Sequence, residues 1–196
     1  MGACARKGQT GFTLLELLIT AVVLAVVAGI ALPSYRTIIR TTRLTTQIYD
    51  FSAALNLARS NAVKRGLPVT ACPSTDQATC GAGGTNWEQG WIVFVDVNSN
   101  HTVDTADARE VVLRASGALV PGYAVRATSA TTLPTYFTVN PKGIPSAAGT
   151  FILCEGGAIN PSRAILVTIA GRISIADDHN GVPVDAGGSD MTSCTP

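Results

Sequence analysis

One carboxylate stands inside the longest apolar stretch of the chain. Residues 12–32 carry Glu16 as their one charged side chain. A carboxylate within a membrane-spanning helix costs about 3 kcal/mol on insertion scales, so it needs a cation at the same depth. An amino terminus created at Phe12 would supply an ammonium group four residues from Glu16. The alternative is an interfacial charge whose side chain snorkels to the headgroups. We expect the ion pair.

A second group of oxygen side chains follows a predicted strand. Carboxylates and amides at alternate positions resemble the start of a calcium loop. His101 stands where such a loop needs glycine, and an aspartate replaces the terminal bidentate glutamate. The competing interpretation is a hydrogen-bonded turn rich in Asn and Asp, which we favour over calcium. The oxygen-bearing residues are Asp96, Asn98, Asn100, Asp104 and Asp107.

The apolar stretch predicts a membrane-spanning helix. Residues 12–32 would span about 30 Å at 1.5 Å per residue, the thickness of a bilayer core. A cleaved secretory signal would have a shorter apolar region ending in small residues. Arg6 and Lys7 precede the stretch, which predicts a cytoplasmic amino terminus and an exported remainder. We assign residues 12–35 to the membrane and expect a kink at Pro33, which lacks an N–H donor.

Residues 36–66 predict an amphipathic helix that continues the first. Its polar face carries several arginines, and Lys64, Arg65, Gly66 and Pro68 provide the signals that end a helix. We expect its apolar stripe to pack on the chain's own sheet. The stripe consists of Leu44, Ile48, Phe51, Leu55, Ala58 and Ala62.

Residues 67–196 change to short runs that favour β-structure, bounded by Gly, Pro and Asn. Ala170-Gly171 is typical of a tight hairpin turn. One long helix followed by eight strands predicts an α+β fold with antiparallel sheets packed on the helix. The expected strands are Val69–Cys72, Trp91–Asp96, Glu110–Arg114, Tyr123–Ala127, Tyr136–Val139, Phe151–Cys154, Ala164–Ile169 and Arg172–Ala176.

The start of the chain resembles a known leader motif. Gly11-Phe12-Thr13-Leu14-Leu15-Glu16, placed between basic residues and a long apolar run, is similar to type IV pilins and pseudopilins. The resemblance implies that prepilin peptidase removes residues 1–11 by cutting between Gly11 and Phe12. It also implies that Phe12 is methylated and that Glu16 helps to dock the subunit into a filament.

Several later segments are similar to the GspH/FimT family of minor pilins and minor pseudopilins. These are Ala58–Ala62, Gly90–Asp96, Val111–Arg114, Arg163–Ile165 and Gly171–Arg172. The resemblance implies the same α+β fold and a role in priming assembly at the filament tip. The implied partners are other minor and major pilins or pseudopilins. A type IV pilus is our first expectation, type II secretion the close alternative.

Four cysteines remain once the leader, which contains Cys4, has been removed. An even number in an exported domain predicts disulfides, and four cysteines allow three pairings. We favour Cys72–Cys80, which closes a small loop, and Cys154–Cys194, which holds the carboxyl-terminal tail. A metal site is the weaker alternative, because no Cys-x-x-Cys occurs and both histidines are distant in sequence.

The sequence does not favour catalysis or DNA binding. It contains no Walker A, Gly-x-Ser-x-Gly, His-Glu-x-x-His or dinucleotide motif, so we expect no enzyme and no cofactor. DNA-binding relatives resemble one another in a Gly-Arg-x-Arg element, whose second arginine is missing after Gly171-Arg172. Arg163 and Arg172 are the residues that DNA capture would use. With a formal charge of +1, we expect weak or no DNA binding.

The expected organisation has four parts. A leader (1–11) precedes a membrane helix (12–35), an amphipathic helix (36–66) and a periplasmic β-rich domain (67–196). The expected location is the bacterial inner membrane with a single pass, followed by the pilus or pseudopilus filament.

Overall fold

The computed structural model describes residues 12–81, 85–128, 135–179, 181–185 and 189–194. It divides into two units, Met1–Thr41 and Thr42–Pro196, which we treat separately. Helix α1 (Leu14–Arg65) begins in the first unit and ends in the second. Its backbone remains helical through Pro33, and the expected kink there stays a prediction.

In the first unit, the described side chains from Phe12 to Leu32 are all exposed. Among the described residues, α1 is the helix long and apolar enough to cross a membrane, and its most apolar part has no cover from the rest of the chain. An apolar surface of this size is unfavourable in water, so it requires lipid or other protein chains around it.

In the second unit, α1 buries the predicted stripe. The side chains of Leu44, Ile48, Phe51, Leu55, Ala58 and Ala62 are at most 1% exposed. The helix then ends as expected: Gly66 adopts φ +66°, and its N–H donates to the carbonyl of Ala62 over 3.0 Å. Glycine suits this left-handed position because it has no Cβ.

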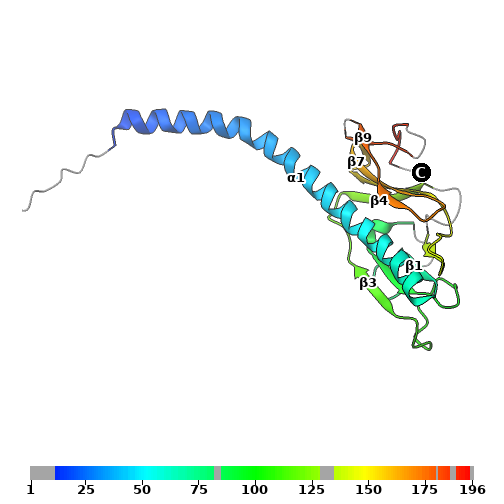
Figure 1. The fold of residues 1–196 in the computed structure, drawn as a ribbon. Helices are drawn as coiled ribbons and strands as arrows, with labels where there is room; N and C mark the ends of the chain where they lie inside the picture. Colours follow the sequence, from blue (N-terminus) through cyan, green and yellow to red (C-terminus); the bar gives the residue numbers. More distant parts are fainter. Residues whose placement is uncertain (1–11, 82–84, 129–134, 180, 186–188, 195–196) are drawn as a thin grey trace, which may run out of the picture. The chain divides into compact units, whose positions relative to one another are not determined.

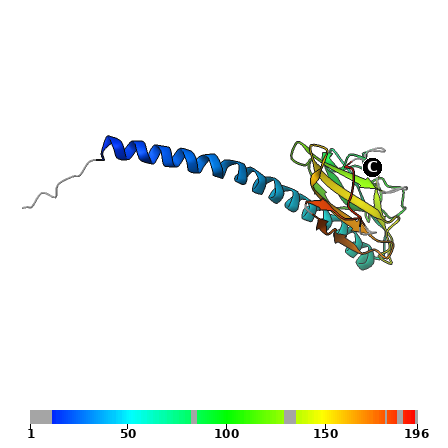
Figure 2. The same ribbon diagram turned by 90° about the horizontal axis from the view of Figure 1, so that it is seen from above.

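Two four-stranded antiparallel sheets cover that stripe, and in Figures 1 and 2 their strands gather around the carboxyl-terminal part of α1. The first sheet has the order β3-β2-β1-β5, and the second has the order β4-β6-β7-β8. A short ribbon pairs β9 with β10. The bounds are β1 Val69–Pro73, β2 Trp91–Val95, β3 Val112–Ser116, β4 Tyr123–Thr128, β5 Phe137–Val139, β6 Gly149–Glu155, β7 Ala158–Val167, β8 Ile173–Ile175, β9 Asp178–His179 and β10 Val182–Pro183, with the 3₁₀ turn η1 at Trp87–Gln89.

Aromatic rings of the helix and both sheets meet in the core. Phe51 of α1 makes edge-to-face contacts with Trp87 of η1, Trp91 of β2 and Phe151 of β6, with ring centroids 5.0 to 5.3 Å apart. Such pairs add about 1 kcal/mol each beyond the burial of apolar area. Phe51 therefore joins the helix to both sheets at one point.

All eight expected strands are present, with shifted ends. The largest shift is in β7, which was expected to begin at Ala164 and begins at Ala158. The added residues include Pro161, which cannot donate to a sheet ladder. Cys154 pairs with Ser162 while Glu155 pairs with Ala158, so Pro161 lies in a bulge that interrupts the register without ending the strand.

Candidate assembly site

The helix that carries Glu16 begins with a side-chain cap. The backbone N–H of Glu16 donates to the hydroxyl of Thr13 over 3.2 Å, and the N–H of Leu17 donates to the carbonyl of Thr13 over 3.2 Å. Thr13 is therefore the N-cap, and Glu16 lies in the first turn of α1. Gly11 is outside the described residues.

Thr13 was not singled out from the sequence, although a signal was present. A Ser or Thr followed three residues later by Glu, ahead of an apolar run, predicts a helix start. The cap fixes the helix start next to Phe12, so Glu16 lies within one turn of any amino terminus made there. A negative charge in the first turn is also favourable to the helix dipole.

The surroundings of Glu16 are apolar and uncovered. Phe12, Leu14 and Leu15 are 82%, 82% and 69% exposed, and the exposed aliphatic series continues along the unit. Glu16 has no ion pair with any described residue. A carboxylate that enters an apolar environment in this state needs a cation that no described side chain supplies.

The second unit contains two disulfides, and they are the pairs favoured from the sequence. Cys72 is bonded to Cys80, eight residues away, and Cys154 is bonded to Cys194, forty residues away. The second bond holds the tail against the outer face of the β4-β6-β7-β8 sheet, where Cys194 and Met191 pack on Ile152 and Ala164. The tail therefore belongs to the folded domain.

Peptide mapping of the chain from native cells, without reduction, should recover both pairs and no free thiol at these four positions. The Cys154→Ser/Cys194→Ser double variant should lose about 4 kcal/mol of unfolding free energy on the loop-closure estimate for a forty-residue separation. The Cys72→Ser/Cys80→Ser variant should lose about 2.5 kcal/mol, because its loop is shorter. Equal losses, or mapping of other pairs, would contradict the expectation.

Asp76 organises the loop closed by Cys72 and Cys80. Its carboxylate accepts hydrogen bonds from the hydroxyls of Ser74 and Thr79 and from the N–H groups of Ala78 and Thr79. These bonds, the largest from the Thr79 hydroxyl, hold the pKa of Asp76 well below its ordinary value. The carboxylate acts here as a turn-forming group.

In the loop from Asp96 to Asp107, the side-chain oxygens accept hydrogen bonds from the protein itself. The buried carboxylate of Asp96 accepts from the Thr70 hydroxyl at 2.7 Å and from the N–H groups of Asn100 and His101 at 3.0 and 3.2 Å. Asn98, Asn100, Asp104 and Asp107 each accept from a backbone N–H two residues on. Hydrogen bonds from Arg109 lower the pKa of Asp107 to about 2. These internal hydrogen bonds are those expected of a turn rich in Asn and Asp, the alternative that we favoured over a calcium loop.

Glu110 completes this loop, and it was not picked out from the sequence. Its side chain is 6% exposed and accepts from the N–H groups of Val97 and Asp104, at 2.9 and 2.8 Å. It lies near the base of the loop rather than among the alternating oxygens. Within the described residues, no group of three or more His, Cys, Asp or Glu side chains is placed to hold a metal ion.

The two arginines considered for DNA capture are not brought together. Arg163 forms an ion pair with Asp178 at 2.7 Å. Arg172 lies at the far end of the same hairpin, where its N–H donates to the hydroxyl of Thr168. Arg126, on β4 at the other edge of the same sheet, pairs with Glu88. A shared phosphate site for Arg163 and Arg172 is therefore not formed.

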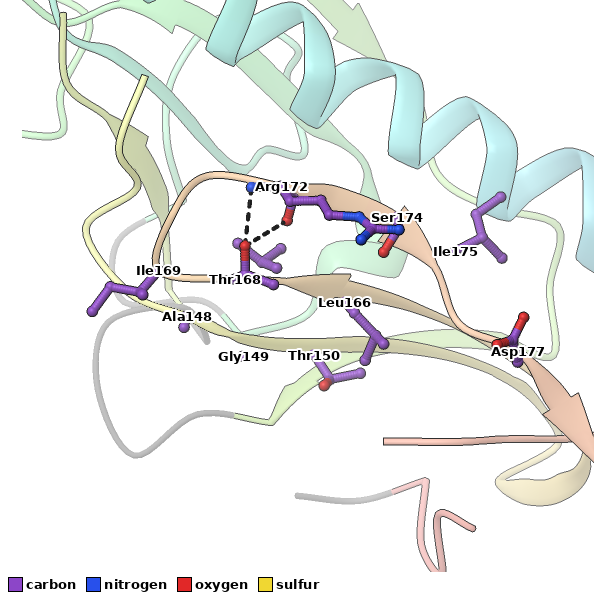
Figure 3. A pocket seen from close by; sticks show the side chains of 11 residues that line it. Ala148, Gly149, Thr150, Leu166, Thr168, Ile169, Arg172, Ser174, Ile175 and Asp177 are labelled. Atoms are coloured by element: carbon purple, nitrogen blue, oxygen red, sulfur yellow. Dashed lines mark hydrogen bonds between the residues drawn. The ribbon is translucent and has the colours of Figure 1, made fainter. Parts of the chain in front are cut away.

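Arg172 instead lines an open cleft on the outer face of the second sheet. The cleft has a volume of about 690 Å³. Its lining combines Leu166 with the hydroxyls of Thr150, Thr168 and Ser174. Figure 3 shows Ile169 extending outward at the hairpin turn, Arg172 lying along the strand and Asp177 at the opposite end of the cleft.

Comparison with known proteins places these features in a family. The family model described as type II transport protein GspH matches residues 47–171, which is well over half of the chain. The prokaryotic N-terminal methylation motif matches residues 6–32 and so includes Gly11, Phe12 and Glu16. No curated protein matches the chain.

Solved structures with the same fold include two crystal forms of the type IV minor pilin FimU from Pseudomonas aeruginosa. They are 18% and 19% identical to this chain, with TM-scores of 0.56 and 0.54. The matches cover 79% and 77% of this chain and 97% and 99% of FimU. The minor pseudopilin EpsH of the Vibrio cholerae type 2 secretion system gives a TM-score of 0.47 at 10% identity, covering 68% of this chain and 95% of EpsH.

At these identities the solved structures support the fold alone. The family assignment rests on the two models, one for the globular part and one for the start of the chain. This chain belongs to the GspH/FimT family of type IV pilin-like proteins, the minor pilins and minor pseudopilins.

Proposed function

We propose that this chain is a minor pilin that is incorporated in a type IV pilus and primes its assembly at the tip. Prepilin peptidase removes residues 1–11, residues 12–35 hold the chain in the bacterial inner membrane, and residues 67–196 form the periplasmic domain. Glu16 pairs with the amino terminus of a subunit during docking. Gly11 and Phe12 are the processing residues.

The observation that carries the proposal is the division of α1. From Leu44 to Ala62 one apolar stripe of the helix is buried by the chain's own sheets, whereas from Phe12 to Leu32 every described side chain is exposed. A helix whose first half is apolar and exposed can be buried in a bilayer before assembly and against like helices in the filament. Glu16 supplies the polar contact that gives such packing a defined register.

A minor pseudopilin of type II secretion is the second candidate, favoured by the description of the family model. The two candidates differ in the machine that contains the subunit. Cross-linked filaments purified through this chain should contain major pilin if the proposal is right. Recovery of pseudopilins and secretion-system proteins instead of major pilin would show that the chain is a minor pseudopilin of type II secretion.

Neither candidate involves catalysis, since both are structural roles in one family. DNA capture at a pilus tip remains an alternative partner that we do not favour. Arg163 is already neutralised by Asp178. The residues after Arg172 contain several aspartates and no lysine or arginine, which disfavours phosphate binding.

Cleavage between Gly11 and Phe12 is the primary test. The intact mass of protein from native membranes should correspond to the 196 residues less the first 11, with one methyl group on Phe12. A Gly11→Val variant should accumulate at full length, because a branched side chain at the cut obstructs the peptidase. A Gly2→Val variant is the control within the leader and should be processed normally. A mature chain that begins elsewhere would remove the main support for the proposal.

A further inference from the structure

Three segments that are far apart in the sequence meet at one backbone contact. The Nε of Arg59 on α1 donates to the carbonyl of Gly143 over 3.2 Å. A Cβ on Gly171, in the β7–β8 turn, would lie 2.1 Å from that same carbonyl oxygen, and a Cβ on Gly143 would lie 3.1 Å from a methyl group of Val63. The end of the helix, the β5–β6 connection and the β7–β8 turn are therefore held together here.

The contact brings exposed apolar and cationic side chains into one surface. Val63, Ile144 and Ile169 are 55%, 42% and 77% exposed, and each comes from a different one of the three segments. Figure 3 shows Ile169 extending outward from the hairpin turn. Val63 lies against Gly143, Ile144 follows Gly143 in the chain, and Ile169 is two residues before Gly171, so all three come from segments joined at this contact. Single exposed aliphatic residues are ordinary, whereas several on neighbouring segments are typical of a docking surface. We call this surface the basic end; it consists of Val63, Lys64, Lys142, Ile144, Ile169 and Arg172.

The cations of the basic end differ from four arginines elsewhere in the second unit. Arg109, Arg114, Arg126 and Arg163 each form an ion pair with an Asp or Glu. The charges of Lys64, Lys142 and Arg172 have no such partner among the described residues. Arg59 and Arg65 add to the same end, and residues 56–65, 140–149 and 166–174 contain no Asp or Glu. No described carboxylate therefore forms an ion pair with these three charges, and Asp177 lies at the opposite end of the cleft that Arg172 lines.

We propose that the basic end docks an acidic face of a neighbouring filament subunit, with Val63, Ile144 and Ile169 forming the buried centre and the cations the rim. An apolar centre with a charged rim is the usual anatomy of a protein interface. Nucleic acid fits less well, because the three aliphatic side chains contribute nothing to phosphate binding and no aromatic ring is present for base stacking. This inference rests on the proposed function, since a neighbouring subunit exists only in a filament.

The test places a photo-cross-linking residue, p-benzoylphenylalanine, at Ile169 in the full chain in its native filaments. We expect a cross-link to one other pilin-like subunit, through a peptide that contains Asp or Glu. Lys142→Glu and Arg172→Glu should each reduce the cross-link about threefold, and together about tenfold, as loss of exposed rim charges predicts. Replacing the partner's carboxylates by lysine should restore it.

Arg109→Glu is the matched control, because it reverses an exposed arginine on a different loop. It should leave the cross-link unchanged. Disulfide mapping and thermal unfolding of Lys142→Glu and Arg172→Glu should match the parent, since Lys142 and Arg172 are exposed and make no ion pair with a described residue.

The outcomes separate this inference from the proposed function. A chain that is present in sheared filaments but gives no cross-link from Ile169 would overturn the inference alone. A cross-link to nucleic acid, to lipid or to a second copy of the chain would also overturn the inference alone. So would a cross-link whose yield is unaffected by the double variant Lys142→Glu/Arg172→Glu. A chain absent from every filament preparation would overturn both.

Discussion

Glu16→Ala is expected to leave the chain in the membrane and to remove it from filaments. The substitution makes residues 12–32 fully apolar, so insertion becomes more favourable. The variant loses the carboxylate that we expect to neutralise a subunit's amino terminus in an apolar environment. Breaking a buried ion pair while one charge remains costs about 3–5 kcal/mol. We therefore expect filament content to fall by at least about tenfold.

The measurement compares the chain in sheared filaments with the chain in washed membranes. Thr20→Ala is the matched control: Thr20 is also exposed on α1, and its hydroxyl only bonds the carbonyl of Leu17 in its own helix. Its ratio of filament to membrane content should equal that of the parent. Glu16→Ala present in filaments at the parental ratio would show that the carboxylate has no part in assembly.

Gly171→Ala is expected to destabilise the domain by about 3 kcal/mol. Gly171 adopts φ +79°, where a side chain is strained, and an added Cβ would lie 2.1 Å from the carbonyl oxygen of Gly143. That atom is backbone and accepts from Arg59, so it cannot move aside without loss of the bond. Backbone strain contributes about 1 kcal/mol and overpacking about 2 kcal/mol of this estimate.

The control for Gly171→Ala isolates the steric contribution. Gly156 adopts φ +62°, and an added Cβ there would meet nothing within 4 Å. Gly156→Ala should therefore lose only about 1 kcal/mol, from backbone strain. Denaturant titration of the detergent-solubilised chain measures both values. Equal losses for the two variants would mean that the Gly143–Gly171 contact is not rigid.

The helix could be predicted from the sequence because its signals are local. Spacing by three and four residues identified the buried stripe from Leu44 to Ala62, and Lys64, Arg65 and Gly66 identified its end. The strands between turn residues were found for the same reason. The strand ends could not be predicted in this way, because a bulge such as the one at Pro161 depends on the partner strand.

The tail was predicted only in part. The pairing of Cys154 with Cys194 was expected from cysteine number, yet β9 and β10 were not. Each has two residues, too few for an alternating pattern to be visible. The bridge between Val184 and Asp190 is likewise invisible in the sequence, because it depends on the tail packing on β6 and β7.

By itself, the sequence determined the apolar helix with Glu16, the amphipathic stripe and the α+β class, because each follows from residue type and spacing along one segment. Only the tertiary structure decided which cations form ion pairs with the described carboxylates and which do not. Arg163 and Arg172 are nine residues apart and look alike in the sequence. Asp178 pairs with Arg163, whereas Arg172 follows Gly171, whose backbone lies against Gly143. Charge pairing and close backbone approach depend on distances in space between remote segments, and these distances exist only in the folded chain.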